Sequence, residues 1–302
     1  MPYPIELING LERGLSDFIN WGLSKKIKFS GSRVLKYVDC LRSYRDALKE
    51  GSLENLIKSQ SAAYLDQIPY EMAELVYLYK SLYEFNDPRL VSRFQSIVQG
   101  SELIADDQSG SSRDFQFELH VAAILFQAKI NKLRFDTRHD LICSLYHNPL
   151  IIECKRPRKD ETIKTSYAAA AYQIESSSLV KTNPMTRGIV ALDLTEVILP
   201  ALDASPHPSL KAVEQAFVKI FVSKWSRLQL TISDYSDRVS ALHLFSRAPW
   251  YININGSYVA FQGQHHLVIV NVKDHQENQK IANTYKEFLD QVKKPPLPFF
   301  KA

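Results

Sequence analysis

The sequence predicts an α/β protein with a mixed central sheet flanked by helices, preceded by a mostly helical N-terminal region. Three observations predict this class. Apolar residues recur at helical spacing through about the first 105 residues. Two β-rich runs then meet at a short Asn-Pro turn, and the mainly apolar run 188–194 is typical of a buried central strand. Helices and strands alternate from there on, as in α/β folds.

Two domains are expected, a helical one over residues 1–110 and an α/β one over residues 111–302. The helical periodicity is clearest in two groups of residues, Val34, Leu35, Val38 and Leu41, and then Leu75, Val76, Leu78, Tyr79 and Leu82. Gly51-Ser52 and Asn86-Asp87-Pro88 read as helix ends or turns. The polar stretch 106–112 is typical of a linker, so we place the boundary there.

The second domain is predicted to begin with a helix over about 113–129, whose apolar face includes Phe117, Val121, Ile124 and Leu125. An antiparallel hairpin follows, with its turn at His147-Asn148-Pro149. The remaining predictions are helices over about 161–178 and 209–230, and strands at 133–135, 139–146, 150–155, 188–194, 241–245, 258–261 and 266–270.

Composition excludes several classes of protein. The chain has 302 residues, a formal net charge of +4 and only three cysteines, with no CxxC pair, so neither a disulfide framework nor a thiolate zinc site is expected. No run of about 18 apolar residues and no signal-peptide pattern occurs, which predicts a cytoplasmic protein without a membrane partner. The charge is compatible with nucleic acid but does not require it.

The residues with chemical potential gather on the predicted hairpin. Asp140 heads its first strand, and Glu153 and Lys155 share one face near the end of the second. Two carboxylates on neighbouring strands can hold one Mg²⁺, a hard ion that accepts carboxylate, water and phosphate oxygens. Glu153-Cys154-Lys155 is the only acid-x-Lys triplet in the chain, although chance alone supplies roughly one or two in this length.

These residues resemble the PD-(D/E)xK superfamily of restriction-endonuclease-like nucleases, over about residues 113–195. Asp140 corresponds to the motif aspartate, Glu153-Cys154-Lys155 to the ExK triplet, and Glu118 and Gln173 to the acid and the polar residue on the flanking helices. The resemblance implies phosphodiester hydrolysis that depends on Mg²⁺, with Mn²⁺ as a substitute. It also implies metal ligation by Asp140, Glu153, Glu118 and the backbone carbonyl of Cys154.

The sequence departs from the family pattern before the aspartate. Arg138-His139 stands where the pattern has Pro, so Asp136 is a rival for the motif position, and Asp140 is preferred because it lies closer to the turn. His139 is a candidate contact for phosphate or metal-bound water. A solvated edge strand with a local ion pair is the alternative interpretation for Glu153 and Lys155. A surface helical acid is the alternative for Glu118, and an ordinary exposed amide is the alternative for Gln173.

Basic residues follow the triplet directly. Arg156, Arg158 and Lys159 are predicted to contact phosphate at the mouth of the cleft, with a solubilising loop as the alternative. Tyr167 and Tyr172 are expected mainly to pack rather than to stack on bases. His265 and His266 are treated as structural, since adjacent strand residues face opposite sides, and Cys143 and Cys154 as small core residues on the face opposite the carboxylates.

The sequence therefore favours a metal-dependent nuclease acting on DNA rather than RNA. Two alternatives stay open, a ribonuclease and a catalytically silent nucleic-acid-binding or assembly module with the same fold. The helical N-terminal region could engage a protein partner or a second copy of the chain, and an analogy with standalone nucleases suggests a role such as phage defence.

Overall fold

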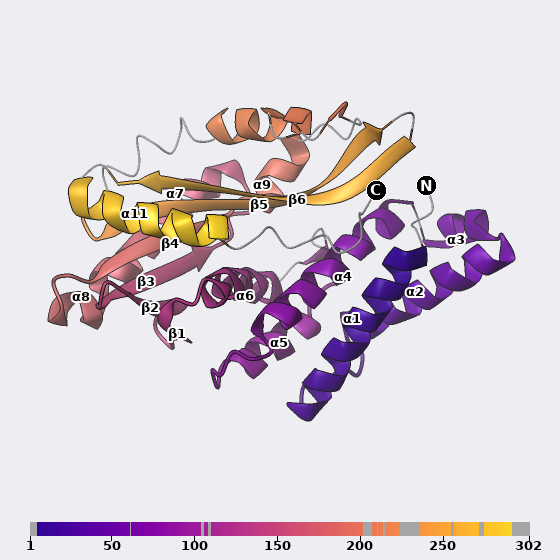
Figure 1. Ribbon diagram of the computed structural model, residues 1–302, viewed down its shortest axis with the longest axis horizontal. Coiled ribbons are helices and arrows are strands. Elements are labelled where there is room, and N and C mark those ends of the chain that lie inside the picture. The colour runs from indigo at the N-terminus through magenta and orange to yellow at the C-terminus, as the bar shows by residue number, and fades with distance from the viewer. Residues whose placement is uncertain are drawn as a thin grey trace. The chain divides into compact units, whose positions relative to one another are not determined.

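The structure is a computed structural model that describes residues 5–60, 62–103, 106–107, 110–201, 207–209, 211–213, 215–223, 236–254, 257–271 and 275–291. It is a mixed α/β protein, as predicted. By internal contacts the chain divides into two compact units (Figure 1). Unit 1 holds the residues up to Ala123, and unit 2 spans Ile124–Lys294. This division falls within a helix, whereas the sequence places a domain boundary at 110/111, and that boundary stays a prediction.

Unit 1 is built from helices in its described part. These are α1 (Ile5–Ser24), α2 (Arg33–Glu50), α3 (Leu53–Gln60), α4 (Ala62–Leu82), α5 (Leu90–Val98) and the greater part of α6 (Ser111–Gln127). Ser32 caps the start of α2 by accepting a hydrogen bond from the backbone N–H of Leu35, and Gly51 ends that helix in the left-handed conformation. The expected helix end at Gly51-Ser52 is thus confirmed.

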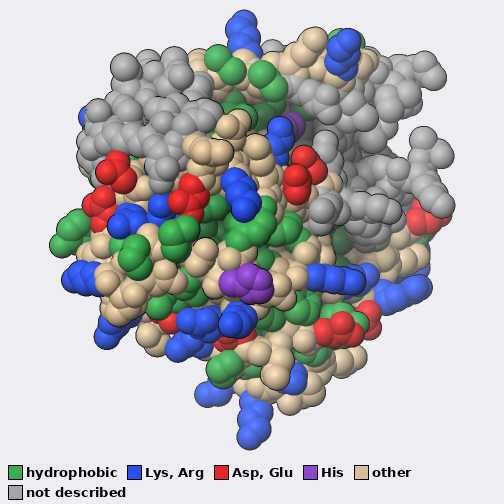
Figure 2. Space-filling view, turned by 60° about the vertical axis from the view of Figure 1, so that its left-hand side comes forward, with side chains coloured by type: hydrophobic (Ala, Val, Ile, Leu, Met, Phe, Trp, Pro, Cys, Tyr) green, Lys and Arg blue, Asp and Glu red, His purple; other side chains and the backbone are tan. Residues whose placement is uncertain are grey.

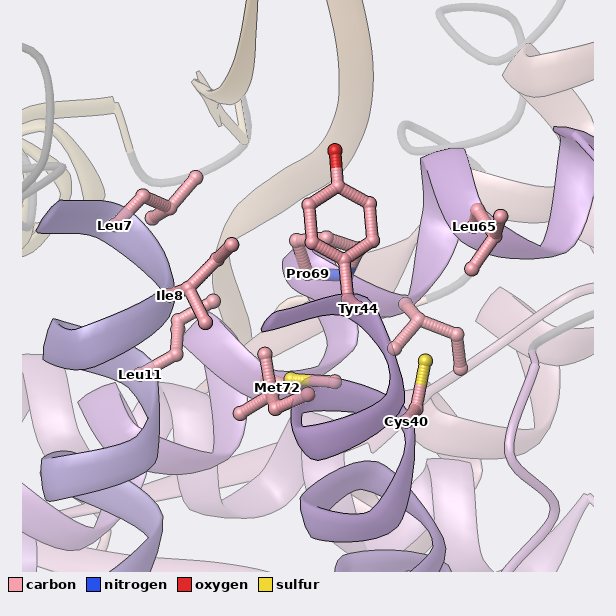
Figure 3. A pocket seen from close by; sticks show the side chains of 10 residues that line it. Leu7, Ile8, Leu11, Cys40, Tyr44, Leu65, Pro69 and Met72 are labelled. Carbon is pink, nitrogen blue, oxygen red and sulfur yellow. The ribbon is translucent and has the colours of Figure 1, made fainter. Parts of the chain in front are cut away.

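A small cavity of about 20 Å³ lies in the core of unit 1 between α1, α2 and α4 (Figure 3). Apolar side chains line it, among them Leu11, Cys40, Pro69 and Met72. A space of this size holds about one water molecule, and an apolar lining offers that water no hydrogen bonds. We therefore read the cavity as a packing defect of the helical core rather than as a ligand site.

Unit 2 is organised around one six-stranded mixed sheet in the order β1-β2-β3-β4-β5-β6. The strands are β1 (Asn131–Phe135), β2 (Leu141–Leu145), β3 (Asn148–Lys155), β4 (Arg187–Asp193), β5 (Val239–Ile254) and β6 (Ser257–Val270). The β3–β4 and β4–β5 pairs are parallel, and the other three are antiparallel. The strands predicted at 258–261 and 266–270 are one strand, and β5 and β6 run side by side as a long ribbon (Figure 1).

The β2–β3 hairpin is confirmed, but its turn is not where the sequence predicts it. Tyr146 and His147 form the turn with φ of 49° and 68°, while Pro149 lies inside β3, opposite Ser144. Two successive positive φ angles are the signature of a tight hairpin turn that usually contains Asn or Gly. Because neither residue is of that kind, the Asn-Pro pair misled the sequence interpretation.

Helix α7 (Asp160–Ser176) covers the face of the sheet to which Glu153 and Lys155 belong. Its buried side chains, including Ala170 and Ile174, share one core with Ile151, and residues of equal parity on β3 face the same side. Gly188 on β4 allows close approach, since a Cβ there would lie 2.6 Å from the Ile174 side chain. Hence α7 sits directly above the parallel strands.

Helix α11 (His275–Gln291), which the sequence did not predict, packs against the other face of the sheet. The Tyr285 hydroxyl hydrogen-bonds to His243 Nδ1 on β5 at 3.0 Å. Burial raises the pKa of Tyr285 far above its usual range, and the nearby thiols of Cys154 and Cys143 raise it further. The predicted placement of these two cysteines in the core, opposite the carboxylates, is therefore confirmed.

Shorter elements complete unit 2. They are α8 (Ser178–Thr182), α9 (Thr195–Ile198) and the 3-10 helix η2 (Leu199–Ala201). The helix predicted over 209–230 is present at 211–213 and 215–223, and the rest of that range lies outside the described residues. In the part of the chain that the structure describes, no helix is long and apolar enough to cross a membrane.

Candidate active site

The predicted carboxylates and lysine converge where β3 ends. Asp140 immediately precedes β2, and the pairing of Leu141 with Ile152 sets it opposite Glu153. The Lys155 ammonium lies 3.8 Å from Asp140 Oδ2 and 3.5 Å from Glu153 Oε2. Two carboxylates and one lysine thus occupy one side of the hairpin, which is the arrangement that the spacing predicts.

Asp140 is held in place by the backbone of the opposite strand. Its Oδ2 accepts a hydrogen bond of 2.6 Å from the N–H of Cys154. The rival Asp136 instead accepts the backbone N–H groups of Arg138 and His139, at 2.9 and 3.3 Å. Partial burial alone would raise the pKa of Asp136, but these two donors, together with the charges of His139 and Arg134, outweigh it and lower that pKa. Asp136 therefore shapes the loop that leads to Asp140.

Glu153 is the most deeply buried member of the site, with no exposed surface. Burial raises its pKa, and the charge of Asp140 adds to this rise, while the hydrogen bond from His139 and the charge of Lys155 oppose it. Its Oε1 is hydrogen-bonded to His139 Nδ1 at 2.6 Å, whereas Oε2 has no hydrogen-bond partner among the described residues. The alternative interpretation of Glu153 as a solvated acid is wrong.

The structure adds two residues, His139 and Ser177, to the surroundings of Glu153, and the sequence predicted neither contact. His139 bridges Glu153 and the hydroxyl of Ser177, which lies 2.8 Å from His139 Nε2 and follows α7 directly. Both side chains are buried. The position of His139 directly before Asp140 was the sequence signal for its contact with Glu153. Nothing in the sequence marks Ser177, because 38 residues separate it from His139.

The donors present suit a hard divalent cation. Asp140 and Glu153 offer carboxylate oxygens on one side of the hairpin, and Oε2 of Glu153 is a buried oxygen that accepts no hydrogen bond from the described residues. Within the described ranges no group of three or more His, Cys, Asp and Glu side chains could hold a metal. The side-chain donors that lie together here are the two carboxylates, and Mg²⁺ would take further ligands from groups such as the Cys154 carbonyl, water and substrate oxygens.

The two helical residues of the predicted site differ in their surroundings. Glu118 on α6 belongs to unit 1 and forms an ion pair of 2.7 Å with Arg93, in which both side chains are about one-tenth exposed. The interpretation of Glu118 as a surface acid is wrong, and its role as a metal ligand stays a prediction. Gln173 lies half-buried on α7, one helical turn before Ser177.

The basic residues after β3 are not equivalent. The Arg156 guanidinium is almost fully buried and forms an ion pair with Glu196 on α9. Arg158 and Lys159 are exposed, and Lys159 occupies the capping position of α7. A phosphate group can therefore approach Arg158 and Lys159 more readily than Arg156.

The aromatic and histidine predictions can also be compared with the structure. Tyr167 is fully buried in the core beneath α7, so its packing role is confirmed, whereas Tyr172 is 70% exposed. His265 stacks on Phe217, while His266 hydrogen-bonds to His243. The two adjacent histidines thus make separate structural contacts, as expected.

Comparison of the chain with protein-family models, with curated proteins and with solved structures gave no match. The residues of the site therefore carry the functional argument.

Proposed function

We propose that this protein is a metal-dependent nuclease of the PD-(D/E)xK type. It would hydrolyse phosphodiester bonds, with DNA favoured over RNA as the substrate. One observation carries the proposal. Two carboxylates, one of them fully buried, lie within 4 Å of a single lysine ammonium at the end of a central strand. Burying Glu153 beside a second acid is costly for the fold, and such perturbed carboxylates occur preferentially at functional sites.

Each residue has a distinct task in this proposal. Asp140 and Glu153 would hold Mg²⁺ or Mn²⁺, together with the carbonyl of Cys154. The bound cation supplies Lewis-acid activation of the phosphoryl group and of water. Lys155, with its ammonium between the carboxylates, is placed to orient the attacking water and to neutralise charge that develops on phosphate oxygens. Gln173 and Glu118 are assigned assisting roles.

Substrate binding would depend on a few local cations. On the face drawn in Figure 2, the described Lys and Arg side chains are interspersed with acidic and hydrophobic ones. The described side chains of this face therefore do not form a broad basic patch that would by itself indicate nucleic-acid binding. Exposed Arg158 and Lys159, directly after the site, are the proposed phosphate contacts, with Arg156 stabilised behind them by Glu196.

The decisive experiment is a cleavage assay with Mg²⁺ or Mn²⁺ on supercoiled plasmid, linear duplex, single-stranded DNA and RNA. We expect cleavage by the parent protein and a loss of about 10²-fold or more for Lys155→Ala. Lys286→Ala is the matched control, because Lys286 is an exposed lysine on α11, on the far side of the sheet. Equal activity of the Lys155→Ala variant and the parent would refute the assignment of Lys155.

A second candidate is a nucleic-acid-binding or assembly module without catalysis. Two observations favour it. The described residues contain no third side-chain donor to complete a metal cluster, and Lys155 already pairs with both carboxylates. Calorimetric titration with MgCl₂ separates the two proposals. Absence of binding at millimolar Mg²⁺, together with absence of cleavage on all four substrates, would favour the module.

A further inference from the structure

We propose that His139 and Ser177 form a positioning relay that fixes the Glu153 carboxylate and directs its Oε2 toward the metal. The inference rests on the proposed function, which it deepens. The two oxygens of Glu153 are in different situations, since Oε1 is hydrogen-bonded to His139 at 2.6 Å and Oε2 has no hydrogen bond within the described part of the chain. The hydrogen bond therefore occupies Oε1, while Oε2 has the Lys155 ammonium 3.5 Å away as its charged neighbour.

The hydrogen-bonding pattern gives each nitrogen of the His139 ring a distinct role, a donor at Nδ1 and an acceptor at Nε2. An ionised Glu153 can only accept, so His139 Nδ1 must carry the proton that it donates to Oε1. In the neutral imidazole, Nε2 then accepts, and the Ser177 hydroxyl 2.8 Å away donates to it. The same hydroxyl oxygen accepts the N–H of Leu179 at 3.2 Å. The Glu153 carboxylate thus fixes the tautomer of His139, and the Ser177 hydroxyl complements it by donating to Nε2 and holding the ring in place.

The relay is anchored at both ends by the backbone. The N–H of His139 donates to Asp136 Oδ1, which holds the loop before β2. At the other end, Ser177 lies between the end of α7 and the start of α8 and caps α8. The relay therefore connects the covering helix to a carboxylate on the central strand, and both anchors are independent of metal.

The order Ser177, His139, Glu153 also matches the groups of a serine-hydrolase triad. Three features argue for a relay instead. Ser177 is only 5% exposed, its hydroxyl caps a helix, and Glu153 shares Lys155 with Asp140. A nucleophilic serine needs an exposed hydroxyl, so the structure assigns Ser177 a positioning role.

The test measures Mn²⁺ binding directly, by electron paramagnetic resonance of free Mn²⁺, on the full chain. His139→Ala should raise the Kd for Mn²⁺ by about 10 to 100-fold, the usual effect of losing an outer-shell partner. His139→Asn, whose amide can donate to Oε1, should restore most of the affinity. Ser177→Ala should fall between His139→Ala and the parent. The cleavage rate should follow Mn²⁺ affinity, so that the variants with a higher Kd cleave more slowly.

Matched controls separate positioning from loss of stability. His120→Ala removes another buried histidine that contacts a carboxylate, Glu74 at 3.1 Å, in unit 1. Ser32→Ala removes another helix-capping serine. Both should lower the free energy of unfolding and leave the Mn²⁺ Kd unchanged.

Four outcomes would overturn the inference. A parent that binds no Mn²⁺ and cleaves nothing refutes the proposed function, and the relay with it. If the parent binds and cleaves, the relay alone is refuted by a His139→Ala variant with the same Mn²⁺ Kd as the parent. It is equally refuted by a His139→Asn variant that binds Mn²⁺ as weakly as His139→Ala. Covalent labelling of Ser177 by a fluorophosphonate probe would show a nucleophile in place of a positioning residue.

Discussion

Two clusters of acidic and basic side chains, one in each unit, have opposite ratios of acids to bases. In unit 1 the carboxylate of Glu71 faces two buried arginines, Arg33 and Arg113, with the closest Arg33 contact at 4.0 Å and Arg113 hydrogen-bonded. In unit 2 two carboxylates, Asp140 and Glu153, face one ammonium. Glu71, whose negative charge is more than balanced by two guanidinium groups, stabilises a helical core. Asp140 and Glu153 together carry more negative charge than the single ammonium balances, and a divalent cation could supply the missing positive charge.

The largest expected effect comes from Glu71→Gln. It leaves two buried guanidinium groups without their carboxylate, and breaking a buried pair costs about 3 to 5 kcal/mol in the free energy of unfolding. Urea denaturation measures this cost. Glu12→Gln is the control, since its partner Arg45 lies at 2.8 Å in a partly exposed pair, and the loss there should stay below about 1 kcal/mol. Equal losses of stability in Glu71→Gln and Glu12→Gln would show that the burial of Glu71 between two arginines does not add to the stability of unit 1.

The second prediction concerns metal linkage. If the unit 2 acids bind Mg²⁺ in the folded state only, a concentration of 100 times the Kd stabilises the protein by about 2.7 kcal/mol. Thermal unfolding with MgCl₂, against KCl at equal ionic strength, measures the shift. Glu153→Gln should lose most of it, and Glu12→Gln should keep it. Stabilisation of the Glu153→Gln variant to the same extent as the parent would place the metal elsewhere.

The hairpin and its acids could be predicted because local pattern determines them. Alternation along two short strands fixes which side chains of each strand share a face. The facing of Asp140 and Glu153 also needs the two-residue turn at Tyr146 and His147, which sets the register of the hairpin. The position of the turn itself was wrong, since Tyr146 and His147 adopt positive φ without a residue type that announces it.

Contacts between segments that are far apart in the chain could not be predicted from the sequence. The hydrogen bond of His139 to Ser177 and the pairing of Arg156 with Glu196 depend on how α7 and α9 lie beside the sheet. Periodicity specifies the inner face of a helix but not which polar residue at its end meets a given partner. For the same reason, Arg156 was grouped with the exposed Arg158.

The third prediction follows from the raised pKa of Glu153. In metal-free buffer the folded state holds this proton to a higher pH than the unfolded state, so the free energy of unfolding falls as pH rises from the ordinary glutamate pKa through the raised one. Glu153→Gln should remove that slope and be more stable than the parent at neutral pH. Glu118→Gln should instead destabilise, because Glu118 pairs with Arg93. Denaturation across pH 4 to 8, about the range in which carboxyl groups with raised pKa values titrate, tests both.

The smallest effect on stability is expected for Lys155→Ala. The Lys155 side chain is 27% exposed, its contacts are 3.5 and 3.8 Å long, and such pairs contribute about 0 to 1 kcal/mol. Part of even this loss is offset, because Glu153 can take up a proton when the ammonium is removed. The variant should therefore unfold almost as the parent does, unlike Glu71→Gln.

Metal affinity and cleavage are expected to change in opposite ways in the Lys155→Ala variant. Removing the ammonium leaves Asp140 and Glu153 without their shared cation, so Mg²⁺ measured by calorimetry should bind Lys155→Ala at least as tightly as it binds the parent, while cleavage is lost. Loss of binding together with cleavage would mean that Lys155 organises the carboxylates, and that the shortage of positive charge around them is not what attracts the metal. Retained binding without cleavage would separate the residues that hold the cation from the residue that uses it.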